Sequence, residues 1–467
     1  MSLGIIRGLF VLGMQITDVL SMVFGAYLAH IVRFGDEVPD RPELTAVGLS
    51  VIITLLVFPA LKATGLPALE NPWRGLKRAS RAFVAVFLVL TMIAFGLQIV
   101  QDFSRIWVGI WLAAAYFSLV CTRIWWSGFL RHGIETGVLR ERVALIHGTG
   151  TRHVDTVARH LGTNGFEIQS LVPIDPSDRP IQTIASGANR GPRRHESLDA
   201  FVQDFGTETV DRAILMPDAT DGRSLRQVAG PLRMVSLDVD VIPSGYDPAL
   251  LGRVPRLAGG IPVVNLMTRP LSDVDVLVKR AEDLVLGTLL LLLAAPVMAV
   301  IAVLVKLDSP GPVLFSQSRA GFNNVPFRIY KFRSMYVHDD PQVRQATRDD
   351  QRITRIGRIL RKTSLDELPQ LLNVIMGSMS LVGPRPHALA HDREYGDLIS
   401  TYIARHRMKP GLTGWAQVNG WRGETESLEK MEKRIEHDLY YVDHWSLYLD
   451  LKIILLTTRV LSHSNAY

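Results

Sequence analysis

The feature that most constrains the fold is a series of four long apolar stretches at the N-terminus. Together they contain one charged residue, Asp18, and they run over Gly8–Val32, Thr45–Leu61, Phe83–Val100 and Ile106–Cys121. Each is close to the roughly 20 residues that an α-helix needs to cross a bilayer. We therefore predict a bundle of four transmembrane helices within residues 1–125, in which Asp18 faces other helices.

The charges between these stretches predict the orientation of the bundle. The first loop is acidic on balance. The second loop and the segment after the fourth stretch are basic, with Lys62, Arg74, Lys77, Arg78, Arg81, Arg123, Arg131, Arg140 and Arg142. Because basic loops stay in the cytoplasm, we expect a multi-pass protein whose N-terminus and whose residues after Arg123 are cytoplasmic.

Composition limits the partners and the chemistry. Hydrophobic residues make up 48% of the 467 residues, and the formal net charge of +6 favours anionic partners such as nucleotides, anionic lipids or nucleic acid. Cys121 is the only cysteine, so an intrachain disulfide and a cysteine metal site are both excluded.

Residues 140–265 alternate predicted strands and helices, which is typical of a Rossmann-like α/β module. A tight turn, His147–Gly150, follows the first strand and precedes a helix predicted over Thr151–Leu161. His153 stands where GxGxxG would have its third glycine, so we assign the module no cofactor. The segment Pro176–Glu196 is predicted to be an excursion from the module. The predicted strands are Val143–Ile146, Phe166–Pro173, Arg212–Met216 and Val239–Ile242.

A fifth apolar run, Leu284–Val305, differs from the first four. Basic residues flank both of its ends, with Lys279 and Arg280 before it and Lys306 after it. Both flanks should therefore be cytoplasmic, and Pro296 in the middle can break a helix. We predict a helix-break-helix over about residues 282–306 that enters one leaflet and returns, which makes residues 275–467 a monotopic domain.

The candidate chemistry lies at Asp366 and Glu367. Adjacent residues on a helix point about 100° apart, so the two carboxylates should have different roles. One could be a nucleophile or base, and the other a ligand of Mg²⁺. The alternative is structural, because Ser364-x-x-Glu367 matches a capping box at a helix start.

Cations around this pair favour phosphate chemistry. A diphosphate needs bidentate arginine contacts and a cation to offset its charge. Pro384 and Pro386 fix the backbone around Arg385, and Lys409–Gly420 has the composition of a binding loop. The candidate substrate-binding residues are Lys331, Arg333, Arg358, Arg361, Lys362, Arg385 and Lys409.

The chain resembles the bacterial polyprenyl-phosphate hexose-1-phosphate transferases, which are monotopic phosphoglycosyl transferases. The resemblance covers Lys279 to the end, and the N-terminal half resembles the long members of that family. The C-terminal stretch is most similar to the undecaprenyl-phosphate glucose phosphotransferases of exopolysaccharide synthesis. The motifs are Lys279-Arg280, Tyr330-Lys-Phe-Arg-Ser-Met335, Ser364-Leu-Asp-Glu-Leu-Pro-Gln370, Val382-Gly-Pro-Arg-Pro386 and Lys409–Gly420.

The resemblance implies an enzyme of the bacterial inner membrane with its catalytic domain on the cytoplasmic face. It would transfer a hexose 1-phosphate, glucose 1-phosphate by preference, from a UDP-sugar to undecaprenyl phosphate, releasing UMP. Asp366 would be the nucleophile that forms a covalent phosphosugar intermediate. Glu367 would help to hold Mg²⁺, and Arg385 would contact substrate phosphate. A C-terminal aspartate also belongs to the family site; Asp450 is the first choice and Asp438 the alternative.

Three other functions stay open at this point. One is the same reaction with UDP-galactose. Another is a membrane-bound nucleotide-sugar dehydratase or epimerase, but it would need GxGxxG and Tyr-x-x-x-Lys. The α/β segment's only tyrosine, Tyr246, is followed four residues later by Leu250. The last is a non-enzymatic membrane scaffold. The expected partners are the UDP-sugar, undecaprenyl phosphate and membrane lipid, without nucleic acid; a homodimer is compatible with the sequence, although no residue indicates it.

Overall fold

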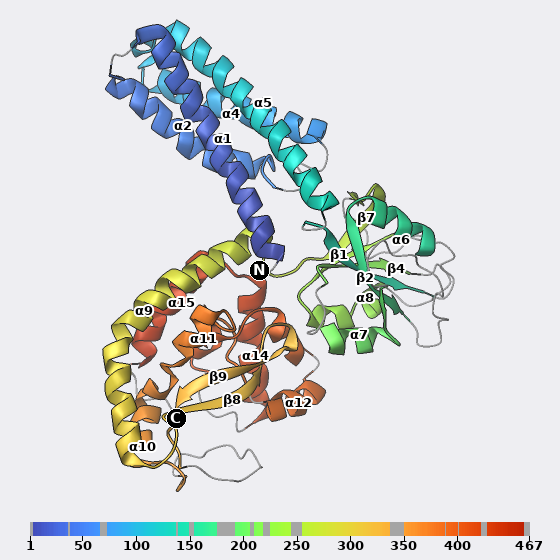
Figure 1. Cartoon of the computed structure of the whole chain (residues 1–467), viewed down its shortest axis with the longest axis vertical. Helices are drawn as coiled ribbons and strands as arrows, with labels where there is room; N and C mark the ends of the chain where they lie inside the picture. The colour runs from blue at the N-terminus through green and yellow to red at the C-terminus, as the bar shows by residue number, and fades with distance from the viewer. Residues whose placement is uncertain are drawn as a thin grey trace. The chain divides into compact units, whose positions relative to one another are not determined.

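The fold is known from a computed structural model, shown in Figure 1. It divides into two compact units, Met1–Arg140 with Asp273–Leu277 and Glu141–Ser272 with Val278–Tyr467. The residues that the structure describes are 3–35, 38–65, 72–136, 139–148, 154–174, 192–205, 210–217, 225–243, 255–336, 350–387, 389–399, 401–421 and 427–461.

The N-terminal unit is built from long helices that contain most of the four predicted stretches. They are α1 (Leu3–Phe34), α2 (Arg41–Ala60), α4 (Pro72–Gly96) and α5 (Arg105–Glu135). Within the described residues, these helices and α9 (Asp273–Asp308) are the ones long and apolar enough to cross a membrane. Large apolar side chains such as Leu56 and Phe95 are exposed on them, as lipid-facing residues would be. The chain is therefore a membrane protein.

The fourth helix is longer than predicted. It continues past Cys121 to Glu135, and Arg123 lies buried within it instead of marking its end. The Arg123 guanidinium donates from Nη2 to Asp18 Oδ2 of α1 at 2.7 Å. A buried charge is tolerated when it is paired, which explains why the helix can continue through this arginine. Asp18 faces a neighbouring helix, as predicted.

The α/β module contains a seven-stranded sheet in the order β3-β2-β1-β4-β5-β7-β6. Strands β1, β2, β3, β4 and β5 pair in parallel, which confirms the predicted parallel sheet, whereas β7 and β6 add an antiparallel edge that was not predicted. Thr149 to His153, which include the end of the predicted turn and the start of the predicted helix, lie outside the described residues. Most of the predicted excursion Pro176–Glu196 lies outside them as well. The strands are β1 (Glu141–His147), β2 (Phe166–Pro173), β3 (Arg193–Arg194), β4 (Arg212–Met216), β5 (Asp238–Val241), β6 (Pro255–Ala258) and β7 (Ile261–Met267).

The helices of the module follow its strands. α6 (Val154–Thr163) comes after β1 and packs against β2, and α7 (Leu198–Asp204) also contacts β2. The short helix α8 (Leu225–Val228) and the turn η3 (Pro231–Met234) separate β4 from β5. The parallel strand order 3-2-1-4-5 is that of a doubly wound nucleotide-binding sheet, which fits the predicted Rossmann-like module.

Helix α9 is a single helix of 36 residues. The prediction that Pro296 breaks it is wrong, because helical backbone continues through the proline. Proline removes one i→i−4 hydrogen bond and commonly bends a helix, and Figure 1 shows the ribbon of α9 changing direction along its length. Much of the helix presents apolar side chains outward, among them Val285, Leu292 and Leu293.

After α9, the C-terminal domain continues with an antiparallel hairpin. The elements are β8 (Leu314–Ala320), β9 (Pro326–Phe332), α10 (Arg355–Thr363), η6 (Leu365–Glu367), α11 (Gln370–Met376), β10 (Ser380–Val382), α12 (Leu389–Leu398), η7 (Tyr402–Arg407), β11 (Gly411–Thr413), α13 (Trp415–Val418), α14 (Leu428–Asp443) and α15 (Leu447–Leu461).

One buried amide connects this hairpin to the helix beside it. Asn373 of α11 accepts from the Tyr330 N–H at 3.0 Å and donates to the Arg328 carbonyl at 2.7 Å. An apolar core surrounds the junction and includes Ile329, Leu371, Val374, Leu381, Tyr441 and Ile453. Because β9 and α11 are fixed to one another, the turn that precedes α11 is held against β9.

Candidate active site

The two candidate carboxylates lie in η6, a short 3-10 turn between α10 and α11. Ser364 ends α10 in the left-handed conformation with φ of 57°. The structural alternative, a capping box, does not form, because the Ser364 side chain makes no capping hydrogen bond and the Glu367 carboxylate bonds elsewhere. Asp366 and Glu367 therefore belong to a tight turn between two helices, not to the first turn of an α-helix.

Glu367 is held by two cations. Its Oε1 accepts from Lys331 Nζ at 2.8 Å and from Arg385 Nη2 at 2.6 Å, and its Oε2 accepts from Arg385 Nη1 at 3.2 Å. Burial by itself would raise the pKa of this carboxyl, but the charges of Arg385 and Lys331 outweigh burial and lower the pKa below its usual range. Glu367 is therefore ionised at neutral pH and holds both cations in place.

Asp366 has a different environment on the same turn. Its side chain is 9% exposed, and no described residue makes a hydrogen bond to it. Burial, and then the neighbouring charge of Glu367, raise the pKa of its carboxyl to about 6, against the opposing charges of Lys331, Arg361 and Arg385. Around neutral pH this is a largely ionised carboxylate to which no described residue donates, and a carboxylate must be ionised to act as a nucleophile. The two carboxylates thus have different surroundings, and their predicted roles as nucleophile and Mg²⁺ ligand stay predictions.

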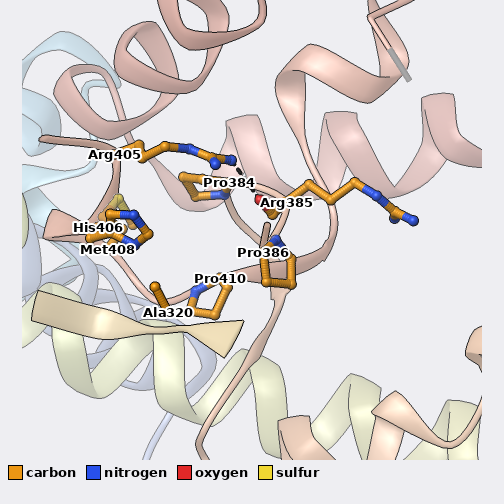
Figure 2. A pocket seen from close by; sticks show the side chains of 8 residues that line it. All are labelled: Ala320, Pro384, Arg385, Pro386, Arg405, His406, Met408 and Pro410. Atoms are coloured by element: carbon orange, nitrogen blue, oxygen red, sulfur yellow. Dashed lines mark hydrogen bonds between the residues drawn. The ribbon is translucent and has the colours of Figure 1, made fainter. Parts of the chain in front are cut away.

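Arg385 is aimed by its loop. Its guanidinium donates to Glu367. Its main-chain carbonyl accepts a hydrogen bond from Arg405, and Figure 2 shows the Arg385 side chain extending away from that bond. The two flanking prolines restrict the backbone, so the direction of the arginine side chain is restricted as well. The small pocket beside the loop is lined by Ala320, Pro384, Arg385, Pro386, Arg405, His406, Met408 and Pro410.

The loop that carries Arg385 lies against the predicted binding loop because glycines allow it. A Cβ on Gly383 would lie 2.3 Å from the Lys409 carbonyl oxygen, and a Cβ on Gly411 would lie 2.1 Å from the Gly383 nitrogen. Strand β10 pairs with β11 at this point through Ser380 and Gly411. The two segments that the sequence predicted to bind substrate are therefore neighbours.

The predicted cations fall into two groups. Lys331 and Arg385 contact Glu367, and the charge of Arg361 acts on Asp366. In the second group, Arg333 binds the Ser309 and Val305 carbonyls instead. Among the described residues, no member of this second group contacts either carboxylate, so their substrate contacts stay predictions: Arg333, Arg358, Lys362 and Lys409.

Asp450, the predicted second metal ligand, belongs to another cluster. It is fully buried, and its Oδ2 accepts from Lys279 Nζ at 2.6 Å and from Trp445 Nε1 at 2.8 Å. Its Oδ1 accepts from the Tyr441 hydroxyl at 2.7 Å. These bonds tie α9 to α14 and α15, and the metal role of Asp450 stays a prediction.

Two features near the site were missed by the sequence analysis. Arg319 of β8 is half-buried, and burial together with the charge of Arg385 lowers its pKa. Arg405, His387 and Tyr402 form a buried polar cluster directly behind Arg385. The run Arg405-His-Arg407 resembles an exposed basic segment in sequence, so nothing in its pattern indicated burial.

An ionised carboxylate beside an anchored glutamate and two cations, in a chain with long apolar helices, defines a membrane enzyme that acts on phosphorylated substrates. Comparison with known proteins agrees with this class. A family model described as bacterial sugar transferase matches residues 274–464, and one described as CoA-binding domain matches residues 67–243.

Relatives extend the similarity over nearly the whole chain. The UDP-glucose:undecaprenyl-phosphate glucose-1-phosphate transferase of Xanthomonas campestris pv. campestris is 36% identical over 466 residues, covering 97% of this chain and 94% of that protein. The protein of the same name from Escherichia coli (strain K12) is 39% identical and covers 88% of this chain and 87% of its own length. The chain therefore belongs to the bacterial sugar transferase family.

Another relative matches a shorter stretch of the chain. The UDP-N-acetylgalactosamine-undecaprenyl-phosphate N-acetylgalactosaminephosphotransferase of Aeromonas hydrophila is 42% identical over 191 residues, which is 41% of this chain and 45% of that protein. Proteins named for different sugars are thus similar to this chain.

Proposed function

We propose that this protein transfers glucose 1-phosphate from UDP-glucose to undecaprenyl phosphate and releases UMP. The proposal rests on the surroundings of Asp366, a buried and ionised carboxylate next to Glu367, which is bonded to Lys331 and Arg385. The names of the relatives supply the donor and the acceptor, since the two that match nearly the full chain are named for UDP-glucose and undecaprenyl phosphate.

The geometry supports a reaction in two displacements. The Asp366 carboxylate oxygen attacks the phosphorus that carries glucose, and the bond from that phosphorus to the bridging oxygen breaks, so UMP leaves with the bonding electrons. A phosphate oxygen of the lipid then attacks the same phosphorus and releases Asp366, forming the lipid diphosphate sugar. Lys331 and Arg385 offset the charge on the phosphoryl oxygens during both steps. No separate base is needed, because neither attacking oxygen carries a proton.

A direct assay tests this function. The full-length protein in lipid nanodiscs should release UMP from UDP-glucose, with sustained turnover when undecaprenyl phosphate is present. Without the lipid, mass spectrometry should show a single adduct of hexose phosphate on Asp366. UDP-galactose and UDP-N-acetylgalactosamine serve as competing donors. Release of UMP from one of them alone would reassign the sugar, and no release from any donor would reject the proposal.

We also propose that Mg²⁺ binds at Glu367 together with the substrate diphosphate. A carboxylate offers about four acceptor positions, and three on Glu367 are used by Lys331 and Arg385. Among the described residues no group of three or more metal-ligating side chains is present. This donor set fits Mg²⁺, which commonly takes one or two carboxylates and completes its shell with phosphate and water. The ion would supply positive charge to the diphosphate.

Chelation and titration test the metal. EDTA should stop UMP release, and MgCl₂ should restore it. Glu367→Gln should raise the Mg²⁺ concentration for half-maximal rate by about tenfold. Asp450→Asn should leave that concentration unchanged, because Asp450 is bonded to Lys279. A matching rise in Asp450→Asn would instead support its predicted metal role.

We propose further that the N-terminal helices span the bacterial inner membrane several times and that α9 enters and leaves it on the cytoplasmic face, in contact with lipid. Basic residues on both sides of the apolar part of α9, Lys279 and Arg280 before it and Lys306 after it, support this topology, as does the helix's change of direction. Ser272 and Ser318 are exposed on either side of the apolar part of α9. In a Cys121→Ser background, cysteines at these two positions should both react with an impermeant maleimide from the cytoplasmic side. Labelling from opposite sides would show a full span.

A further inference from the structure

A buried aspartate lies between two buried arginines behind the active site. Asp438 of α14 is 2% exposed, and Arg405 and Arg434 are buried with it. Asp438 Oδ2 accepts from Arg405 Nη2 at 2.7 Å and from Arg405 Nε at 3.1 Å. A buried charge is costly unless its donors and acceptors are satisfied, so this group must be assembled for the domain to fold around it.

Each arginine also donates to the main chain of a different loop. Arg405 Nη2 donates to the Arg385 carbonyl at 2.5 Å, the bond drawn in Figure 2. Arg434 Nε donates to the Trp421 carbonyl at 2.9 Å, just beyond the Lys409–Gly420 loop. Asp438 of α14 therefore lies near two arginines, one bonded to the loop that carries Arg385 and the other bonded next to the Lys409–Gly420 loop.

Arg405 fixes the Arg385 loop at a second point. Its Nη1 lies 2.7 Å from His387 Nδ1, and the Tyr402 hydroxyl lies 2.6 Å from the same nitrogen. Arginine has no acceptor, so His387 Nδ1 must accept and the ring must be neutral there. Burial, and then the charge of Arg405, lower the pKa of His387 well below its usual value. The residues on both sides of Pro386 are thus held by one guanidinium.

We propose that Arg405, held in place by Asp438, is a positioning residue that directs the Arg385 side chain toward Glu367 and the substrate phosphate. The inference rests on the proposed function. It assigns Asp438, the alternative candidate for the C-terminal site aspartate, to positioning and not to metal binding. Lysine cannot replace Arg405 in this arrangement, because a single ammonium cannot reach Asp438, His387 and the Arg385 carbonyl in the geometry of the planar fork.

A double-mutant cycle on the full-length protein in nanodiscs tests the inference. Arg405→Lys should lower kcat/KM for UDP-glucose by about tenfold, the effect of a slightly misplaced binding group. In an Arg385→Lys background, Arg405→Lys should change kcat/KM less than about threefold, because the Arg385 guanidinium that Arg405 positions is already absent. The matched control is Arg434→Lys, whose effect should multiply with that of Arg385→Lys, since Arg434 bonds to Trp421 instead.

The Kd for UDP is also measured by calorimetry for the wild type, both single variants and the double variant. This second cycle tests the inference even if the wild type releases no UMP. Absence of UMP release from the wild type would reject the proposed function alone. Multiplicative effects of Arg405→Lys and Arg385→Lys in both measurements would overturn the positioning role, as would a loss of thermal stability with unchanged kcat/KM and Kd. If Arg405→Lys does not fold, Asp438→Asn, which keeps an oxygen acceptor for Arg405, takes its place in the cycle.

Discussion

Two buried charge clusters in this molecule differ in how completely their charges are paired. In the sheet, Arg212 of β4 contacts Glu141 of β1 at 2.8 Å and also Asp240 of β5, and Asp240 accepts from Asn265 at 2.9 Å. In the turn before α11, Glu367 is paired just as fully, but Asp366 beside it has no hydrogen bond from a described residue.

The difference separates a structural cluster from a reactive one. The charges of Glu141 and Asp240 outweigh the effect of burial and raise the pKa of Arg212, so this cluster is stable as it is and fixes three neighbouring strands. Burial, and then the charge of Glu367, raise the pKa of the Asp366 carboxyl, and no described residue donates a hydrogen bond to it. A buried charge is therefore a weak sign of function, and a buried carboxylate left without a donor beside fixed cations is a stronger one.

The largest effect is expected from removing that carboxylate. Asp366→Asn keeps the shape of the side chain but not its nucleophilic charge, so UMP release should fall by at least about a thousandfold. The hexose-phosphate adduct should disappear at the same time. Asp443→Asn, an exposed aspartate of α14, is the matched control and should retain activity. Normal turnover by Asp366→Asn would show that the reactive cluster has been misassigned.

The next largest effect is expected from Arg385, which is paired with Glu367 and is proposed to contact the substrate phosphate. Arg385→Lys removes the two-point contact with Glu367, and kcat/KM for UDP-glucose should fall by about a hundredfold. The melting temperature should change little, since the main-chain bond from Arg405 remains. An equal loss of stability and activity would place Arg385 with the structural cluster.

A change of pH should separate the two clusters without a mutation. With a carboxyl pKa of about 6, Asp366 is mostly ionised at pH 7 and mostly protonated at pH 5. Only the ionised form attacks phosphorus, so kcat/KM should fall by about tenfold between these values. Measuring kcat/KM from pH 4.5 to 8 tests this decrease, and circular dichroism over the same range confirms that the protein stays folded. A flat profile down to pH 5 would contradict an unpaired Asp366.

The sequence predicted the parts of this site that are close together in the chain. Asp366, Glu367 and Arg385 lie within 20 residues, and prolines and basic neighbours indicated their chemistry. Lys331, which the sequence also named as a candidate, lies on β9 and contacts Glu367, and its substrate contact stays a prediction. The parallel strands of the module followed from runs of buried apolar residues.

Long-range pairing was harder to predict. Asp450 looks like a free acid in the sequence, but folding brings it to Lys279, which lies 171 positions away. Arg123 looked like a helix end until its partner Asp18 was known. The sequence of Ser364-x-x-Glu367 fits a helix cap, and only the contacts from β9 and the Arg385 loop show why the glutamate is used differently.

The smallest effect on activity is expected from breaking the structural cluster itself. Arg212→Met leaves Glu141 and Asp240 buried without their cation, which should destabilise the α/β module by about 3 kcal/mol. The turn that carries Asp366 contains none of these residues, so kcat/KM per folded molecule should stay within about threefold of the wild type. Replacing Arg212, Glu141 and Asp240 together by apolar residues should recover much of the stability, because no unpaired charge then remains. Thermal unfolding in nanodiscs and UMP release measure the two quantities. If Arg212→Met removed activity while the protein remained folded, the sheet cluster would be functional as well, and full pairing of buried charges would no longer distinguish the two clusters.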